Sequence, residues 1–308
     1  KTIDAARRRR SRADGAGHLQ LMADELEAAA ARDTDVPDDR LRLMFACAHP
    51  ALDPGIRAPL ILQTLLGFDA ATIASAFLIA PSTMGQRLVR AKNKIKQAGI
   101  PFRVPDHTEL HERLDAVLEA IYAAFAEGWS DPAGTEARRR DLAHEAIWLG
   151  RLVVALLPEE PEALGLLALM LHAEARRAAR RNAQGAYVPL AEQDVTCWDT
   201  RSIEEAEALL RRASGLAAIG RYQLEAAVQS ANVVRRFTGQ ADWEAIEQLY
   251  DALAALTDSP VVAINRAVVM AERRGPAAGL AALDALANDP RLAEHQPYWA
   301  ARAGLLAR

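Results

Sequence analysis

The sequence is poor in aromatic residues, in cysteine and in the alternating patterns that form strands. Aromatic residues make up 5% of the 308 residues, and β-branched residues never alternate over a strand-length run. Alanine is abundant instead, and alanine favours helix more than any other residue. A hydrophobic content of 51% and a charged content of 25% are those of an ordinary globular chain. This composition predicts an all-α fold.

Long apolar runs are also missing. No run approaches the roughly 18 residues that a spanning helix needs, and the N-terminus has no signal-peptide core. We therefore expect no membrane partner and a cytoplasmic location. The two cysteines, Cys47 and Cys197, are far apart in sequence and sit in apolar contexts. They are expected to be reduced core residues rather than a disulfide.

The motifs of common enzyme classes are absent. The chain has no GxGxxG after a strand, no P-loop, no GxSxG and no HExxH. His107 and His111 are four residues apart, but no third metal ligand is near them in sequence. We therefore predict no catalytic set, no metal site, no cofactor and no enzymatic activity. The irregular insert from Asn182 to Thr200 is the one candidate for a pocket, and it either lines a site or caps the helices around it.

The most informative stretch runs from Phe68 to Ala98 and contains two helical patterns. The first, Asp69 to Phe77, offers Ile73, Ala74 and Phe77 to a core, and Leu78 to Pro81 form a turn. The second pattern runs from Ser82, a possible N-cap, to Ala98 and has an apolar stripe at helical spacing, formed by Met84, Leu88, Ala91 and Ile95. Two short helices joined by a turn predict a helix-turn-helix.

The other side of the second helix is polar and cationic. If this helix enters a DNA major groove, its first turns reach base edges and its later residues meet phosphates. The predicted base contacts are Ser82, Thr83, Gln86 and Arg87. The predicted phosphate contacts are Arg90, Lys92, Lys94 and Lys96. A solvated amphipathic helix without any DNA contact has the same periodicity, so the pattern alone does not distinguish it from a DNA-binding helix.

The distribution of charge favours the DNA-binding interpretation. Residues 37–104 carry nine basic and four acidic residues, a net charge of +5, although the whole chain has a net charge of −4. Residues 105–308 carry 21 basic and 30 acidic residues, a net charge of −9. Positive charge is therefore segregated in the segment that contains the two helical patterns, as phosphate binding requires.

Three segments follow from these patterns. Residues 1–36 form a charged linker, with six cations and one acid in residues 1–12, then six acids and one cation in residues 13–36. Residues 37–104 form a four-helix DNA-binding domain, in which Arg40 to Ala48 and Gly55 to Gly67 precede the two helices described above. Two prolines in the sequence IPFRVPD, from Ile100 to Asp106, mark its end.

Residues 105–308 read as a succession of nine helices with short connections. The segment from Asp242 to Ala287 resembles tetratricopeptide helix pairs, with Ser259-Pro260 opening one helix and Gly275 separating two others. We predict a tetratricopeptide-like helical domain. A helical solenoid of this kind presents a concave face to a protein or a ligand.

The segment LRLMFACAHPALDPGIRAPLILQTLLGFDAATIASAFLIAPSTMGQRLVRAKNKIKQAGIPFRVP resembles region 4 of the extracytoplasmic-function (ECF) sigma factors. The motifs GIPFRVP, AFAEGW, LPEEPEALGLLALMLHAEARR, YQLEAAV and LTDSPVVAINRAV resemble the subgroup with a C-terminal tetratricopeptide-like extension. Members of that subgroup often have asparagine and tyrosine where this chain has Ala126 and Trp129, which leaves the role of these two positions open.

The resemblance implies promoter DNA, through its −35 element, and the RNA polymerase core as partners. It also implies a regulatory role for the C-terminal helices, through a protein or a ligand. Region 2 of a sigma factor, which melts the −10 element, is not in this chain, and residues 1–36 would then be the linker that follows it. The alternative is a helical-repeat adaptor whose basic module binds acidic protein partners.

Overall fold

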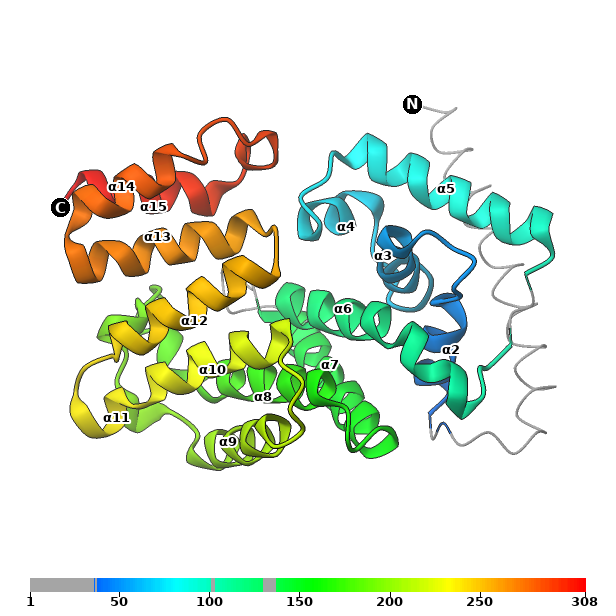
Figure 1. Ribbon diagram of the computed structural model, residues 1–308, viewed down its shortest axis with the longest axis horizontal. Helices are drawn as coiled ribbons and strands as arrows, with labels where there is room; N and C mark the ends of the chain where they lie inside the picture. Colours follow the sequence, from blue (N-terminus) through cyan, green and yellow to red (C-terminus); the bar gives the residue numbers. More distant parts are fainter. Residues whose placement is uncertain (1–35, 37, 101–102, 130–136) are drawn as a thin grey trace. The chain divides into compact units, whose positions relative to one another are not determined.

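The computed structural model describes residues 36, 38–100, 103–129 and 137–308 (Figure 1). All regular elements within these residues are helices, and the only extended pairing among them is an isolated bridge between Arg181 and Tyr187. The prediction of an all-α fold is therefore confirmed. None of the described helices combines the length and the apolar character that crossing a bilayer requires. The predicted charged linker, residues 1–36, lies outside the described residues except for Val36.

The chain divides into two compact units, which we describe separately. The first unit comprises residues 1–73 and 82–120, and the second comprises residues 74–81 and 121–308. Helix α6, Leu110–Trp129, contributes to both units. The boundary between the two compact units falls within α6, after Ala120, and the predicted domain division at residue 105 stays a prediction.

The first unit opens with two helices that have clear start signals. Helix α2, Asp39–Cys47, begins after Asp38, whose carboxylate accepts hydrogen bonds from the amides of Arg40 and Leu41 at 2.9 and 3.1 Å. Helix α3, Pro54–Leu65, has proline in its first turn, where the missing amide hydrogen costs nothing. These helices match the predicted ones to within two residues at each end.

Helices α4, Ala70–Ala76, and α5, Pro81–Ala98, follow with a four-residue connection. The Asp69 carboxylate caps α4 by accepting the amide of Thr72 at 2.8 Å. Leu78 in the connection has a φ of +51°, a left-handed conformation that reverses the chain direction without glycine. The predicted turn was placed one residue late, because Pro81 is the first residue of α5 and not the last of the turn.

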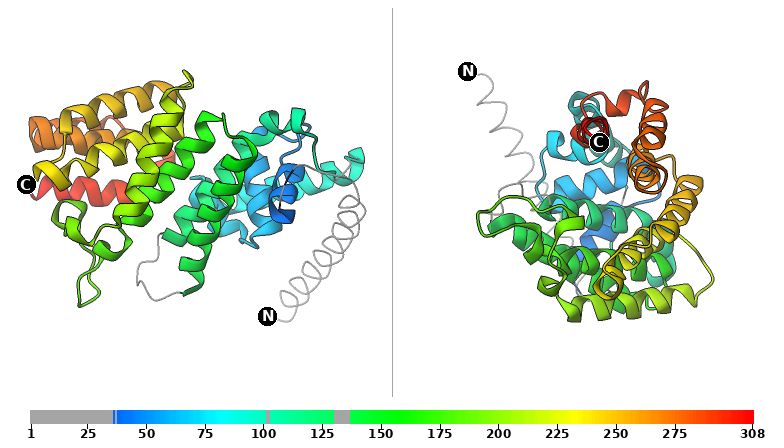
Figure 2. Two further views of the ribbon diagram at one scale, coloured as in Figure 1. Left: turned by 90° about the horizontal axis from the view of Figure 1, so that it is seen from below. Right: turned by 90° about the vertical axis from the view of Figure 1, so that its left-hand side faces the viewer.

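The second unit consists of helices joined mostly by short loops, except between α8 and α9, where the connection contains the irregular insert (Figure 2). Its helices after α6 are α7 (Ala137–Leu156), α8 (Pro161–Ala175), α9 (Thr200–Ser214), α10 (Arg221–Val233), α11 (Arg235–Thr238), α12 (Trp243–Leu256), α13 (Pro260–Arg274), α14 (Pro276–Asp284) and α15 (Gln296–Leu306). Helix α8 packs against α7, α9 and α10, α10 against α12, α12 against α13, and α13 against α14. This succession of neighbours is typical of a helical repeat. The identity of the repeat stays a prediction.

Two details explain how closely α8 and α10 pack. Gly165 of α8 faces the start of α10, where a Cβ atom on it would lie 2.6 Å from the amide nitrogen of Gln223. The Glu162 carboxylate, also on α8, accepts the amides of Tyr222 and Gln223 at 2.9 and 3.1 Å. The Glu162 carboxylate of α8 therefore caps the start of α10, and this contact fixes the register between the two helices.

The irregular insert caps the helices around it. Trp198 is 3% exposed and packs with Ala175, Ala179, Ile203 and Val233. The guanidinium of Arg235 donates hydrogen bonds to two backbone carbonyls of the insert. Of the two interpretations that the sequence left open, the structure supports capping.

Two predictions about this part of the chain were wrong. The sequence pattern predicts a helix from Thr108 to Ala126 with Gly128 just after its end, but α6 continues through Gly128 to Trp129, so Gly128 is a helical residue. The ring of Trp129 explains the extension, because it stacks on Phe125 and lies 4.1 Å from the guanidinium carbon of Arg180. Cys197 is exposed and not a core residue.

His172 of α8 is a polar residue inside an apolar helix, and it is 1% exposed. Neither ring nitrogen has a hydrogen-bond partner. Burial, with a smaller contribution from Arg176, lowers the pKa of His172 from 6.5 to about 4. Glu207 lies 3.5 Å from the Nε2 atom and would favour the charged ring, but burial dominates. His172 is therefore neutral at pH 7.

We predict that His172 makes the protein acid-sensitive. Between pH 6.5 and 4 the unfolded chain binds a proton that the folded chain does not, so the free energy of unfolding falls as the pH falls. A shift of this size corresponds to about 3 kcal/mol. The difference in unfolding free energy between His172→Leu and the wild type should change by about that amount over this range, measured by urea unfolding. His144→Leu, at an exposed histidine, serves as the control, and parallel pH profiles for wild type and His172→Leu would contradict the prediction.

Candidate nucleic-acid interface

An apolar stripe packs helix α5 against the core of the first unit. Met84, Leu88 and Ala91 are 0, 2 and 6% exposed, as their spacing predicts. Ile95, the fourth predicted member, is only half-buried, because the last turns of α5 extend beyond the core. Ser82 was predicted as a possible N-cap, but it lies inside the helix that starts at Pro81. Its hydroxyl is on the exposed surface.

Seven of the eight predicted contact residues are exposed, and Thr83 is half-buried. They do not all share one face. At 100° per residue, one side of the helix collects Thr83, Gln86, Arg87, Arg90 and Lys94. Lys92 and Lys96 lie toward the opposite flank of the buried stripe, and Ser82 lies between the two groups. The structure therefore brings together five of the eight residues.

A groove runs beside the first of these faces. It has a volume of about 400 Å³ and lies between α5 and the start of α3, lined by Leu52, Asp53, Ile56, Arg87, Arg90, Ala91 and Lys94. A second hollow of about 450 Å³ is lined by Arg90, Asn93, Lys94, Gln97 and Ala98. Arg90 and Lys94 line both, so they form a cationic ridge between the two hollows.

The loop between α2 and α3 forms the far wall of the groove, and sequence motifs gave no sign of this role. The guanidinium of Arg57 donates hydrogen bonds to the carbonyls of Pro50 and Leu52, at 2.8 and 3.1 Å. The ammonium of Lys94 donates to the carbonyl of Ala51. The backbone carbonyls of this loop thus accept hydrogen bonds from two cations, and one of these bonds holds Lys94 beside the loop. Asp53 is the one acid in the groove wall, and its carboxylate caps α3 by accepting the amide of Gly55 at 3.0 Å.

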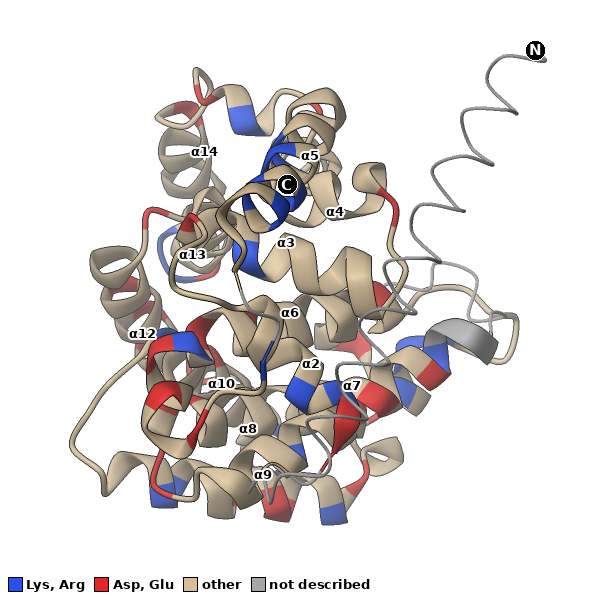
Figure 3. Ribbon diagram, turned by 90° about the vertical axis from the view of Figure 1, so that its right-hand side faces the viewer, with Lys and Arg blue, Asp and Glu red and all other residues tan. Residues whose placement is uncertain are grey.

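The cations of α5 differ from most of the arginines in the second unit. Among the described residues, none of the five, Arg87, Arg90, Lys92, Lys94 and Lys96, forms an ion pair with a carboxylate, and α5 itself contains no acid (Figure 3). Arginines of the second unit are paired, in Arg151–Glu205, Arg266–Asp251, Arg302–Asp284, Arg308–Glu272 and others. Within the described residues, the positive charge of α5 therefore has no carboxylate counter-charge.

Lys92 has a different environment from the other cations. Its amine interacts with the thiol of Cys47, which is buried, and burial raises the pKa of that thiol to about 12. The thiol is therefore uncharged and offers Lys92 no counter-ion. Partial burial lowers the pKa of Lys92 itself, although the side chain as a whole is exposed. Lys92 is a weaker candidate for phosphate contact than Arg90 or Lys94.

A buried arginine fixes the chain that follows α5. Arg113 of α6 is 1% exposed, and its guanidinium donates to the carbonyl of Phe45 at 3.2 Å and to the Glu109 carboxylate at 3.4 Å. Arg103 holds the same carboxylate with two hydrogen bonds of 2.7 Å. Burial lowers the pKa of Arg113, and the hydrogen bonds from Arg103 lower the pKa of Glu109. The segment predicted as a plain boundary is therefore tied to the core of the first unit.

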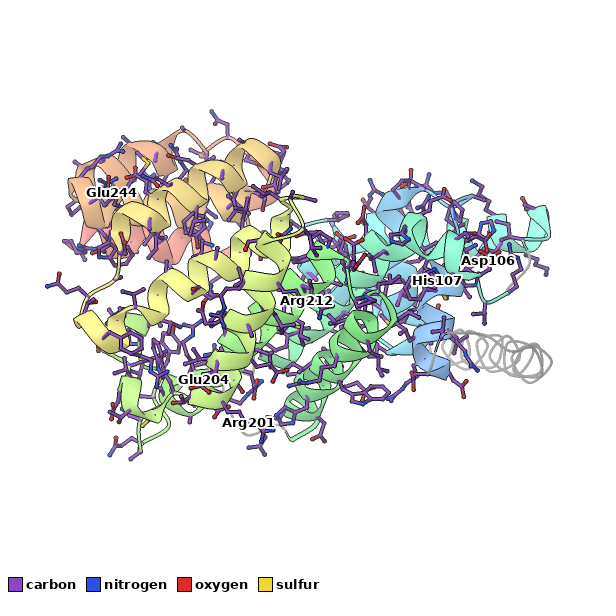
Figure 4. All side chains as sticks on the ribbon, turned by 60° about the horizontal axis from the view of Figure 1, so that its bottom comes forward. Asp106, His107, Arg201, Glu204, Arg212 and Glu244 are labelled. Atoms are coloured by element: carbon purple, nitrogen blue, oxygen red, sulfur yellow. The ribbon has the colours of Figure 1, made fainter. Side chains whose placement is uncertain are left out.

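Asp106 and His107, labelled in Figure 4, lie at the start of the short helix η1, His107–Glu109. Asp106 accepts the amide of Thr108 at 3.1 Å, and Glu109 accepts the amide of Asp106 at the same distance, which forms a capping box. His107 and His111 belong to successive helices. Within the described residues, no group of three or more histidine, cysteine or acidic side chains could hold a metal ion.

Comparison with known proteins adds relatives whose functions are not known. Residues 113–214 match a family of unknown function (DUF6596). This match covers most of α6 and all of α7, α8 and α9, but it does not include α5. The chain is 42% identical over 285 residues to an uncharacterized protein of Rhizobium meliloti (strain 1021). The match covers 92% of this chain and 66% of that protein, so the chain spans slightly less than two thirds of its relative. No solved structure matches the chain.

We predict that Glu109 stabilises the first unit mainly through Arg113. Glu109→Ala would leave a buried guanidinium without its carboxylate, at a cost of about 2–3 kcal/mol. Arg103→Ala removes only an exposed partner and should cost less than about 1 kcal/mol. Urea unfolding of both variants measures the difference. Equal losses would show that Arg113 does not depend on Glu109.

Proposed function

We propose that this chain carries the −35 recognition part of an ECF-type sigma factor, with α5 as the helix that enters the major groove. The observation that carries the proposal is the set of exposed cations on α5 that lack carboxylate partners in the described residues. The net charge of +5 in residues 37–104 and the resemblance of this segment to region 4 support it. The connection of α4 to α5 through a four-residue turn also fits a helix-turn-helix.

The exposed face of α5 suggests a division of labour. Its first turns carry short and amide side chains, Ser82, Thr83 and Gln86, which can read base edges by hydrogen bonds. Arg87 follows them, and an arginine can bind guanine with two parallel hydrogen bonds. Arg90 and Lys94 line the groove beside the α2–α3 loop, and we assign them to phosphates. Lys92 and Lys96 lie on the other flank of α5, and we assign them to phosphates as well.

The second unit would then be a regulatory domain. Residues 74–81 and 121–308, which form this unit, carry 20 basic and 25 acidic residues, a net charge of −5, which disfavours contact with DNA. We propose that its helices bind a regulatory protein or a ligand, whereas contact with the RNA polymerase core belongs, by the resemblance, to the region 4 segment. Promoter opening is not assigned to this chain, because the resemblance places that activity in region 2.

We predict salt-dependent DNA binding that depends on α5. Arg90→Ala and Lys94→Ala should each weaken the binding of any duplex and reduce the slope of log K against log salt by about 0.9. Gln86→Ala should instead change the preference among duplex sequences, with little effect on the slope. Fluorescence anisotropy with labelled duplexes at 50 to 300 mM salt measures both effects.

Arg201→Ala is the matched control for these variants. Arg201 is an exposed arginine of α9 (Figure 4), in the acidic part of the chain, and its loss should leave DNA affinity unchanged. If the affinity does not depend on salt, or if Arg201→Ala weakens binding as much as Arg90→Ala does, α5 is not the DNA-binding surface.

The second candidate function is a helical-repeat adaptor whose basic module binds acidic proteins. The succession of packed neighbouring helices from α8 to α14, which is typical of a helical repeat, supports it. The two functions differ in their partners.

We predict that the tagged chain retains purified RNA polymerase core in a pull-down. Arg201→Ala should retain as much core as the wild type. A second pull-down uses a bacterial lysate. If the chain retains acidic proteins from the lysate but does not retain the polymerase core in either pull-down, the adaptor is favoured and the sigma factor is contradicted.

A further inference from the structure

Arg176, which directly follows helix α8, has no carboxylate partner among the described residues. Its neighbour Arg177 differs, because it pairs with Glu174 at 2.7 Å. Burial, followed by the charge of Arg180, lowers the pKa of Arg176 to about 10. The guanidinium is therefore still charged at pH 7. A partly buried charge without a counter-charge is costly, so its presence at the end of α8 points to an anion that binds there.

The fold holds the Arg176 side chain in place through two hydrogen bonds. Its Nε donates to the carbonyl of His172 at 3.4 Å, and its Nη2 donates to the Oε1 of Gln229 on α10 at 2.6 Å. Within the described residues, the Nη1 of Arg176 and the amide nitrogen of Gln229 form no hydrogen bond. Two N–H donor groups on neighbouring side chains therefore remain for an acceptor. An oxyanion suits them, because hydrogen bonds between charged groups are the strong ones.

The end of α8 supplies only part of the missing negative charge. The carbonyls at the C-terminal end of a helix carry partial charges that sum to about half an elementary charge. This is less than the full charge of Arg176. His172 lies one turn earlier on α8 and is neutral at pH 7, and the nearby Glu207 carboxylate faces that ring at 3.5 Å and forms no ion pair with Arg176. The described residues around Arg176 therefore leave its charge uncompensated.

A second guanidinium lies near Arg176. Arg180, in the short helix η2 (Arg177–Arg180), is close enough for its charge to lower the pKa of Arg176. Its side chain is held by Trp129, because the guanidinium carbon lies 4.1 Å from the centre of the indole ring and Nη1 donates to the Trp129 carbonyl at 2.7 Å. Two like charges in one place repel each other, and an anion that contacts both offsets this repulsion.

An aromatic ring borders the two guanidinium groups. The centre of the Tyr187 ring lies 5.9 Å from the guanidinium carbon of Arg180, and Tyr187 is 61% exposed. A tight turn places the ring there, because the amide of Val188 donates to the carbonyl of Arg180 at 2.8 Å and an isolated bridge joins Arg181 to Tyr187. The exposed ring offers an apolar surface to the organic part of a ligand whose charged group binds the arginines.

We propose that Arg176 and Gln229, together with Arg180, bind the oxyanion of a small molecule, a phosphate or carboxylate group. Tyr187 borders the organic part of that molecule. All four residues belong to the second unit. The inference gives a ligand class to the regulatory role of this unit, and in that respect it rests on the proposed function. Binding of the anion itself needs no DNA, so the two can be measured separately.

Inorganic phosphate and, separately, succinate are the probes for this site in the full chain. Each replaces chloride at pH 7 and constant ionic strength, and binding is measured by isothermal titration calorimetry and by the melting temperature. At least one of the two anions should bind and raise the melting temperature. Arg176→Gln should weaken that binding about tenfold or more, because hydrogen bonds from a charged donor are lost.

Arg211→Gln is the matched control. Arg211 is an exposed arginine of α9. The start of α9 meets the end of α8, since the amide of Asp199 donates to the carbonyl of Ala175 at 2.9 Å. Arg211 lies roughly 16 Å further along α9, so this variant removes the same charge away from the site. Its affinity for either anion should equal that of the wild type.

Gln229→Glu tests the same site in the opposite direction. The added carboxylate would give Arg176 the ion pair that it lacks in the described residues. It should therefore raise the melting temperature of the ligand-free chain by about 2–4 °C and abolish the binding of phosphate and succinate. Gln248→Glu, at an exposed glutamine of α12, adds the same charge and should change neither property. This pair of variants decides the matter even if Arg176→Gln does not fold.

The outcomes separate this inference from the proposed function. Anion binding that the two site variants lose and the two controls keep supports the inference, and the anion that binds shows whether the ligand carries phosphate or carboxylate. The inference is overturned if neither anion binds, if Gln229→Glu binds as the wild type does, or if all variants bind equally, as they would on the cations of α5. None of these results affects DNA binding by α5, which is measured with labelled duplexes. Failure of that DNA binding would contradict the proposed function and leave the anion site in place.

Discussion

The pairing of arginine with carboxylate is the interaction on which the charge pattern of this protein depends. The second unit contains many arginines and a larger number of acids, and its helices are linked by pairs such as Arg273 and Arg274 with the buried Glu247. A buried carboxylate needs such partners, because an uncompensated charge inside a protein is costly. On α5 the same chain leaves five cations within ten residues and supplies no acid. The repulsion between neighbouring cations is weak in water, whereas the attraction of several cations to a polyanion is strong.

A helix with such a surface needs a firm attachment on its other side. Met84, Leu88 and Ala91 supply it by burial, and the chain on either side of α5 is also fixed. Before the helix, the Asp69 carboxylate caps α4, and after it the Arg103–Glu109–Arg113 contacts join the start of α6 to the carbonyl of Phe45. The exposed face is thus held by contacts on both sides of α5, which suits the proposed role of this helix in a DNA groove.

The sequence predicted the helices of this chain well because their apolar spacing and caps are local properties. Local patterns could not show that Arg113 is buried or that the α2–α3 loop forms the wall of a groove, since both depend on contacts between residues distant in sequence. Gly128 shows a further limit, because glycine signals a helix end unless a contact such as the one between Trp129 and Arg180 extends the helix. The eight predicted contact residues follow one another along α5, but the turn of the helix places five of them on one face, Lys92 and Lys96 on the other flank, and Ser82 between the two groups. Whether they bind DNA stays a prediction.

The use of lysine on α5 fits the proposed contact with a polyanion. Nearly all cations elsewhere in the chain are arginines, whose planar fork forms directional pairs with single carboxylates, as in Arg103 with Glu109. A lysine ammonium is a compact and strongly hydrated charge that attracts any nearby anion without fixed geometry. Arg87 and Arg90 would then provide orientation, and the three lysines would provide attraction. A face of this kind suits the proposed contact with DNA phosphates, because its lysine contacts form and break without fixed directional bonds.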